Sequence, residues 1–97
     1  MRRLDQTRAT LIAEAGVNHD GDLPKALKLV DVAAEAGADF VKFQMFRADA
    51  IAAKSAPKAE YQSRAIGDGG QQEMLRALEL SPDAFAAIIA HCEAAGV

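Results

Sequence analysis

The chain has 97 residues, a net charge of −3 and a hydrophobic fraction of 51%, with only 5% aromatic residues. This length suits one small domain or part of a larger one, with a thin core. The acidic balance argues against a nucleic-acid surface, which needs a basic stripe, and no segment approaches the roughly 20 apolar residues of a membrane span. Residues 1–6 lack the apolar run of a signal peptide. The single Cys92 excludes an internal disulfide and favours a reducing, cytoplasmic location.

The first predicted element is a strand over residues 9–15. Its side chains are mostly small and apolar, which suits a strand that is buried on both faces. Glu14 lies inside this strand, Asn18 and His19 follow its carboxyl end, and Gly21 allows the turn that comes next. In α/β proteins that end of a strand is where chemistry is usually placed. A buried carboxylate is costly unless it is paired or used. The segment is therefore either a functional site or a capped loop with a solvated Glu14, and His19 either serves the site or bonds a loop carbonyl.

A helix and a second strand are predicted next. Asp22 is a candidate N-cap, and Pro24 is tolerated in the first turn. Apolar residues then recur at helical spacing up to Gly37, which ends the helix, and residues 39–44 form the second strand. The order strand, helix, strand with short connections predicts a βαβ unit, with two parallel strands and a right-handed crossover.

Residues 45 to about 70 show no clear period, and a loop of that length is usually functional or disordered. Tyr61 within it is either a lid or partner contact or a local anchor. A helix over residues 71–80 follows, and Ser81-Pro82 begins a last helix that Gly96 ends. We expect His91 at the surface or in packing. One face of the last helix is apolar, with Phe85, Ile88, Ile89 and Cys92. The predicted fold class is α/β: the first two βα units of a TIM (β/α)8 barrel, incomplete in this chain.

Strand parity brings side chains together. Lys42 and Gln44 share the face of the second strand opposite Val41 and Phe43, which should pack on the helices. If Glu14 shares the face of Lys42, a carboxylate and an ammonium meet on neighbouring strands. This pair could be purely structural, with each ion offsetting the cost of burying the other. Lys42 otherwise binds an anion as a point charge or, as a neutral amine, forms a Schiff base. The neighbouring carboxylate favours the charged form and therefore anion binding.

Two sequence blocks carry a family resemblance. They are residues 12–22, IAEAGVNHDGD, and residues 36–44, AGADFVKFQ, with further support from residues 56–62 and 73–81. Together they resemble the N-terminal part of the sialic acid synthase family, which includes N-acetylneuraminate, legionaminate and pseudaminate synthases. The resemblance implies a TIM barrel followed by a small antifreeze-like domain. Residues 1–97 would then be the N-terminal segment of the barrel, with the rest of the barrel and the C-terminal domain absent.

The resemblance also implies a reaction. Family members condense phosphoenolpyruvate with N-acetylmannosamine or a related amino sugar and water, and a nine-carbon acid and phosphate form. By position, Glu14 matches the catalytic glutamate near the sugar and the metal, and Lys42 matches the lysine that holds phosphoenolpyruvate. Gln44 matches a pocket glutamine, and Asn18 and His19 match a substrate-binding pair at the mouth.

The resemblance implies a divalent metal, manganese or magnesium, whose histidine ligands lie outside this chain, so no metal ligand is expected within it. It implies a homodimer for the complete enzyme and no activity for the 97-residue piece. The alternatives are a Schiff-base aldolase that uses Lys42 and a non-catalytic truncated or interaction fragment.

Overall fold

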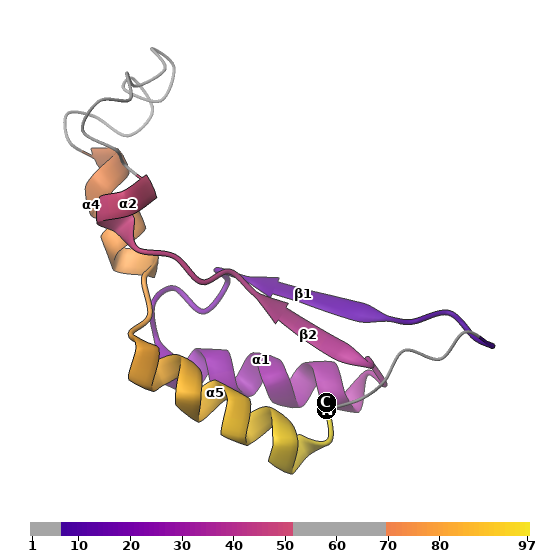
Figure 1. Cartoon of the computed structure of the whole chain (residues 1–97). Helices are drawn as coiled ribbons and strands as arrows, with labels where there is room; N and C mark the ends of the chain where they lie inside the picture. Colours follow the sequence, from indigo (N-terminus) through magenta and orange to yellow (C-terminus); the bar gives the residue numbers. More distant parts are fainter. Residues whose placement is uncertain (1–6, 52–69) are drawn as a thin grey trace.

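The computed structural model describes residues 7–51 and 70–97. A two-stranded sheet forms one layer, and two helices cover one of its faces (Figure 1). Two further helices lie beyond the carboxyl ends of the strands. This arrangement confirms the α/β class. In chain order the elements are β1 (Ile12–Gly16), α1 (Leu23–Glu35), β2 (Phe40–Phe43), α2 (Ala48–Ile51), α4 (Gly70–Leu78) and α5 (Pro82–Ala95).

The two strands are parallel, as predicted. Both are shorter than predicted, and β1 begins three residues later, at Ile12. The carbonyl of Leu11 accepts the N–H groups of Asp39 and Phe40 at 2.8 and 3.2 Å, so pairing starts there. A bulge interrupts the ladder near its carboxyl end, because the step from Glu14 to Gly16 on β1 matches one residue on β2.

The core lies between the sheet and the helices α1 and α5. Val41 and Phe43 pack against it, which confirms the predicted orientation of β2. Ile89 was placed on the same apolar face of the last helix as Ile88 but is 61% exposed. It follows Ile88 directly and is rotated by about 100° around the helix from that buried residue. The buried cluster consists of Ala26, Val30, Leu80, Ala84 and Ile88.

The helix ends follow local chemistry, with one exception. The Ser81 hydroxyl accepts the N–H of Ala84 at 3.1 Å, and Gly96 ends α5 in the left-handed conformation, both as predicted. Gly37, with φ of +81°, follows the end of α1 as expected. Asp22 occupies the predicted N-cap position of α1, but its side chain makes no capping hydrogen bond. The turn before α1 is held instead by the Asp22 N–H, which donates to the His19 carbonyl at 2.9 Å.

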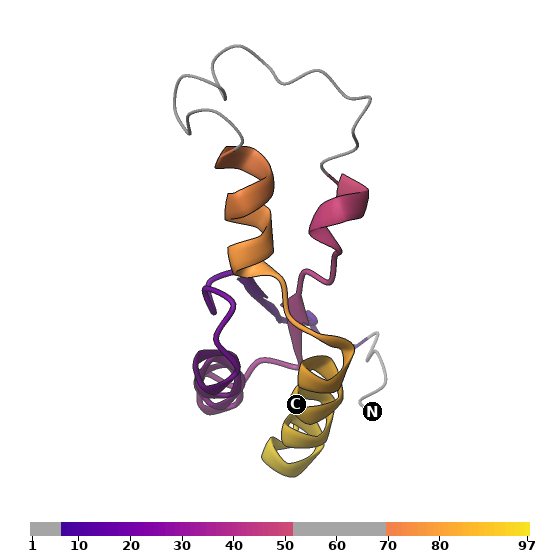
Figure 2. The same cartoon turned by 90° about the vertical axis from the view of Figure 1, so that its left-hand side faces the viewer.

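The segment after β2, in which no regular structure was predicted, contains the short helix α2. Figure 2 shows α2 and α4 side by side, above the sheet. The Glu79 carboxylate accepts the N–H of Ala48 at 2.7 Å, and Arg76 pairs with Asp49 at 3.2 Å. The start of α2 is therefore tied to the end of α4 and to the residue that follows it. α4 begins and ends slightly earlier than predicted. Tyr61 lies outside the described residues, as do the loop residues Lys54, Lys58 and Arg64.

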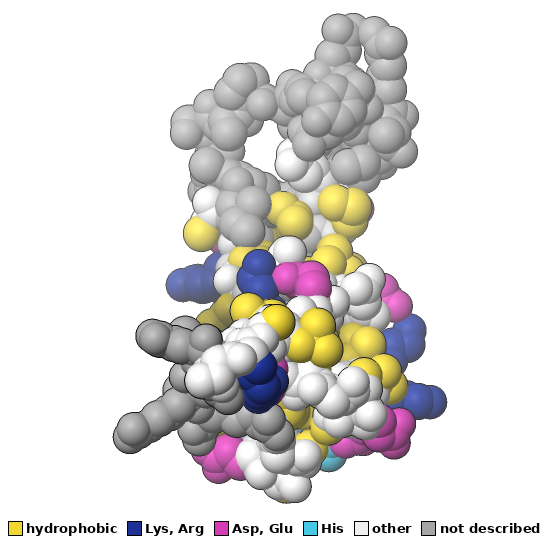
Figure 3. Space-filling model, turned by 90° about the vertical axis from the view of Figure 1, so that its right-hand side faces the viewer, with side chains coloured by type: hydrophobic (Ala, Val, Ile, Leu, Met, Phe, Trp, Pro, Cys, Tyr) yellow, Lys and Arg dark blue, Asp and Glu magenta, His cyan; other side chains and the backbone are white. Residues whose placement is uncertain are grey.

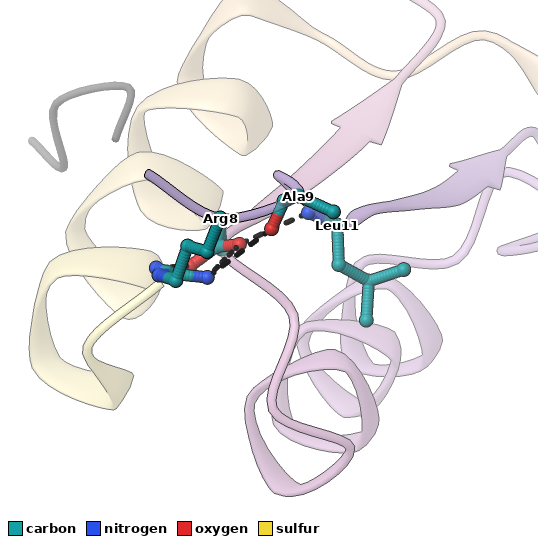
Figure 4. Close-up of polar contacts among 4 residues, drawn as sticks. Arg8, Ala9 and Leu11 are labelled. Carbon is teal, nitrogen blue, oxygen red and sulfur yellow. Dashed lines mark hydrogen bonds and ion pairs between the residues drawn. The ribbon is translucent and has the colours of Figure 1, made fainter. Parts of the chain in front are cut away.

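An ion pair with a buried carboxylate and an exposed guanidinium holds the amino ends of the strands together (Figure 4). Arg8 donates to both carboxylate oxygens of Asp39, at 3.0 and 2.6 Å, and the Leu11 N–H donates to the same carboxylate at 3.0 Å. Asp39 is only 4% exposed, so each oxygen is satisfied within the protein. These bonds connect the approach to β1 with the start of β2 across 31 residues of sequence.

Apolar side chains also reach the surface, as the face in Figure 3 shows. None of the helices in residues 7–51 and 70–97 is long and apolar enough to cross a membrane. The exposed large hydrophobic residues are Leu11, Ile12, Val32, Met45, Met74 and Ile89.

Candidate functional site

Glu14 and Lys42 are paired across the two strands. They are register partners on β1 and β2, and the Lys42 Nζ lies 3.2 Å from the Glu14 Oε2. The predicted pair therefore forms. It was expected to be enclosed, but the side chains of Lys42 and Glu14 are 63% and 50% exposed. The described helices that contact the sheet cover its other face (Figure 1), so this pair stays open to solvent.

Gly16 makes room beside this pair. A Cβ at that position would lie 3.1 Å from the Glu14 Oε1 and 3.9 Å from the Gln44 Nε2. The Glu14 carboxylate and the Gln44 amide thus come together over a residue with no side chain. Gly16 also has φ of +56°, a conformation that side chains disfavour. The bulge explains the approach, because it moves Gly16 opposite Phe43, next to Gln44. This role of Gly16 was not predicted, although a glycine that ends a strand is a signal for a bulge.

Asn18 and His19 belong to the turn that follows β1. The Asn18 N–H donates to the Ala15 carbonyl at 3.0 Å, and the Asn18 side chain is exposed. His19 is different, because its side chain is fully buried, with 0% exposed. Its ring stacks on Phe43, with centroids 6.2 Å apart and an interplanar angle of 29°. Asn18 thus remains accessible, whereas the described structure leaves His19 no surface for a ligand.

The surroundings of His19 define its protonation. The Nδ1 atom accepts the N–H of Gly21 at 2.9 Å, so a neutral ring carries its proton on Nε2. Within residues 7–51 and 70–97 that Nε2 has no hydrogen-bond partner. Burial lowers the pKa of His19 below its usual value of 6.5, and the Asp20 carboxylate opposes this shift. The imidazole is therefore a neutral, buried group at neutral pH.

The same turn is anchored to its surroundings at two further points. Asp20 pairs with Lys25 on α1 at 2.9 Å, with both side chains exposed. A Cβ on Gly21 would lie 2.0 Å from the carbonyl oxygen of Ala77, so only glycine allows this approach to the end of α4. The turn therefore packs between β1, α1 and α4.

The described residues do not form a metal centre. Across residues 7–51 and 70–97, no three His, Cys, Asp or Glu side chains group as metal ligands. Glu14 stands beside Lys42, a cation that competes for the same carboxylate. These residues therefore do not fit the divalent metal that the resemblance implies, and its binding would need ligands from elsewhere in a complete enzyme.

The predicted site residues thus fall into two groups. Glu14, Lys42 and Gln44 come together on the open face of the sheet and are called the strand-end cluster below. Asn18 lies in the adjoining turn, and His19 lies behind the strand, against Phe43. His91 is partly exposed and bonds Asp31 at 2.7 Å, outside the cluster.

Comparison with solved structures supports the fold. The chain resembles a sialic acid synthetase from Leptospira borgpetersenii with a TM-score of 0.66 and 25% sequence identity. The match covers 92% of this chain and 27% of that one.

Comparison with curated proteins gives the same relationship. The chain is 57% identical over 74 residues to the N,N'-diacetyllegionaminic acid synthase of Legionella pneumophila, which covers 75% of this chain and 21% of that protein. It is 46% identical over 87 residues to the Campylobacter jejuni enzyme of the same name, covering 89% of this chain and 26% of that enzyme. The chain thus spans about a fifth to a quarter of these relatives. The profile of the NeuB family matches residues 29–97. The resemblance to sialic acid synthases is confirmed, and the chain belongs to the NeuB family.

Proposed function

We propose that the complete protein containing this chain is a nonulosonic acid synthase. In the proposed reaction, C3 of phosphoenolpyruvate bonds to C1 of N-acetylmannosamine or a related amino sugar. Water adds at C2, the C2–O bond breaks, and phosphate leaves. The observation that carries the proposal is the strand-end cluster: a carboxylate and an ammonium 3.2 Å apart, beside an amide, on neighbouring parallel strands. The two legionaminic acid synthases to which the chain is similar support it.

Each member of the cluster has a proposed role. Lys42 binds phosphoenolpyruvate, because an exposed ammonium is a point charge suited to phosphate and carboxylate groups. Glu14 orients a sugar hydroxyl or the attacking water, or accepts its proton. Gln44 lines the pocket with an amide that donates and accepts hydrogen bonds. Asn18 lies at the mouth, where it contributes to substrate binding.

The proposal extends to the architecture. Residues 1–97 supply the first two βα units of a TIM barrel, and the remaining units close it over the open face of β1 and β2. An antifreeze-like domain follows, and the complete enzyme is a cytoplasmic homodimer. Manganese or magnesium assists it, with ligands beyond the described residues. The parallel strands and the likeness to a sialic acid synthetase support the barrel assignment.

Phosphate release tests the proposed reaction. The complete enzyme is incubated with phosphoenolpyruvate, manganese or magnesium, and N-acetylmannosamine or a diacetylated relative of it. We expect phosphate only when both phosphoenolpyruvate and an amino sugar are present. No phosphate with any N-acylated amino sugar would contradict the proposal.

Borohydride distinguishes this chemistry from an aldolase. A Schiff-base aldolase forms a covalent bond to its lysine, whereas the proposed synthase uses Lys42 only as a point charge, 3.2 Å from the Glu14 carboxylate. We expect no reduced adduct on Lys42 when borohydride is added during turnover and the peptides are weighed by mass spectrometry. An adduct on Lys42 would indicate the Schiff-base mechanism.

A further inference from the structure

His19 is a polar side chain with no access to solvent, which sets it apart from the other predicted site residues. Its exposed fraction is 0%, whereas the side chains of Glu14 and Lys42 are half exposed or more. A buried imidazole loses its hydration, and that loss needs compensation. The only hydrogen bond to its ring in the described part of the chain comes from Gly21, to Nδ1. The ring therefore holds its place by one hydrogen bond and by packing.

The packing partner connects His19 to the strand-end cluster. Phe43 stacks on the imidazole at 6.2 Å and lies between Lys42 and Gln44 in the sequence. Side chains alternate along a strand, so a ring that fixes Phe43 from the core side fixes the direction of both neighbours on the open side. The Gln44 N–H also donates to the Gly16 carbonyl at 3.3 Å, at the last backbone link between the strands.

The hydrogen bond connects His19 to the turn. Its Nδ1 accepts the Gly21 N–H, and Gly21 packs directly on the carbonyl of Ala77. The imidazole thus joins the turn after β1 to the end of β2. A contact of this kind holds reacting groups in register, and a displacement of about 1 Å can cost roughly 100-fold in rate.

We infer that His19 is a positioning residue for the strand-end cluster, which acts through the Phe43 ring on Lys42 and Gln44 without touching substrate. This inference rests on the proposed function for its kinetic readout. His19 was expected to bind substrate directly, and the inference gives it an indirect role. The contact that carries this role is the stacking of the His19 ring on Phe43.

Two variants of the complete enzyme separate the ring contact with Phe43 from the hydrogen bond with Gly21. His19→Phe keeps an aromatic ring for Phe43 but has no acceptor for Gly21. His19→Asn keeps an acceptor at the position of Nδ1 but has no ring. The control is His91→Asn, the same change at the second histidine of residues 1–97, which bonds Asp31 on the far side of the core from the cluster. The readouts are KM for phosphoenolpyruvate, kcat, and the thermal unfolding midpoint.

Which of the two variants loses more kcat/KM for phosphoenolpyruvate decides the inference. We expect kcat/KM for phosphoenolpyruvate to fall about 10- to 100-fold in His19→Asn, mostly through KM, and within about threefold of the parent in His19→Phe. A hydrogen bond from His19 to substrate predicts the opposite order, because only asparagine keeps a polar group. That order, an equal loss in both variants, or a loss of stability without a kinetic change would overturn the inference.

Crystal structures keep this test separate from the proposed reaction. In His19→Asn we expect Lys42 and Gln44 to be displaced, with the Lys42 Nζ no longer 3.2 Å from the Glu14 Oε2, and in His19→Phe we expect both in place. If the parent enzyme releases no phosphate, the proposed function fails, and these displacements still decide the role of His19. Unmoved side chains in His19→Asn would contradict that role even in an active synthase.

Discussion

Glu14 and Lys42 are direct register partners on parallel strands, and their charged atoms lie 3.2 Å apart on an open face. Exposed ion pairs contribute only about 0–1 kcal/mol to stability. The pair therefore adds little to the stability of the fold, but it places two groups of opposite charge side by side near the strand ends. The ammonium can bind an anion, and the carboxylate can accept a proton.

The first prediction concerns the carboxylate. In Glu14→Gln of the complete enzyme, the side chain keeps its size but no longer accepts a proton. We expect kcat to fall about 100- to 10,000-fold, the range for loss of a general base. KM for phosphoenolpyruvate should change little, because Lys42 remains. Glu35→Gln, an exposed change on α1, is the control, and a kcat for Glu14→Gln equal to that of this control would contradict the role.

The second prediction concerns the space over Gly16. Gly16→Ala places a Cβ 3.1 Å from the Glu14 Oε1, whereas Gly37→Ala meets nothing within 4 Å. Both glycines have positive φ, so each change should cost roughly 1–2 kcal/mol of unfolding free energy. We expect only Gly16→Ala to lower kcat/KM, by about 10-fold or more. Urea unfolding and steady-state kinetics measure the two effects, and equal kinetics in both variants would show that the cluster does not need this space.

Much of this arrangement can be predicted from sequence. The parity of β1 and β2 predicted that Glu14 and Lys42 would meet, because side-chain alternation needs only the strand assignment. Both ends of α5 were also predicted, since Ser81 at its start and Gly96 at its end act through local backbone geometry.

Most of the errors and omissions share a cause. The Arg8–Asp39 pair spans 31 residues, and no local pattern signals it. The burial of His19 depends on Phe43, a residue on another strand. Asp22 has the sequence of an N-cap, but the backbone of the preceding turn already orders the helix start. Ile89 fits an apolar face that is wider than the contact between α1 and α5. Apart from the Asp22 turn, which is local, each outcome depended on contacts between residues far apart in the sequence.

The third prediction is a pH dependence of stability. Burial lowers the pKa of His19 in the folded protein below its usual 6.5. As the pH falls below 6.5, the unfolded chain takes up a proton before the folded one does, so unfolding becomes more favourable. The stability is fully present above 6.5 and is lost as the pH falls through the lowered folded-state pKa.

Urea unfolding between pH 7.5 and pH 5 measures this loss. We expect its slope with pH to be smaller in His19→Phe, which cannot take up a proton. Parallel curves for His19→Phe and the parent protein would show that His19 does not titrate in this range.

The fourth prediction compares two ion pairs. Asp39→Ala removes a buried carboxylate that Arg8 and the Leu11 N–H both bond. We expect a loss of about 1.5–3 kcal/mol, the range for hydrogen bonds to charged groups. Asp31→Ala breaks an exposed bond to His91 and should cost about 0.5 kcal/mol or less. Urea unfolding of both variants gives the comparison, and equal losses would mean that the Asp39 contacts do not hold the strands.

Binding of phosphoenolpyruvate to Lys42 variants tests the central proposal most directly. Titration calorimetry on the complete enzyme compares Lys42→Ala with Lys25→Ala, whose ammonium pairs with Asp20 in the turn. We expect Kd to rise about 10- to 100-fold in Lys42→Ala, because charged hydrogen bonds contribute about 1.5–3 kcal/mol, and to stay unchanged in Lys25→Ala. An unchanged Kd in a folded Lys42→Ala enzyme would contradict the assignment of the strand-end cluster as the phosphoenolpyruvate site.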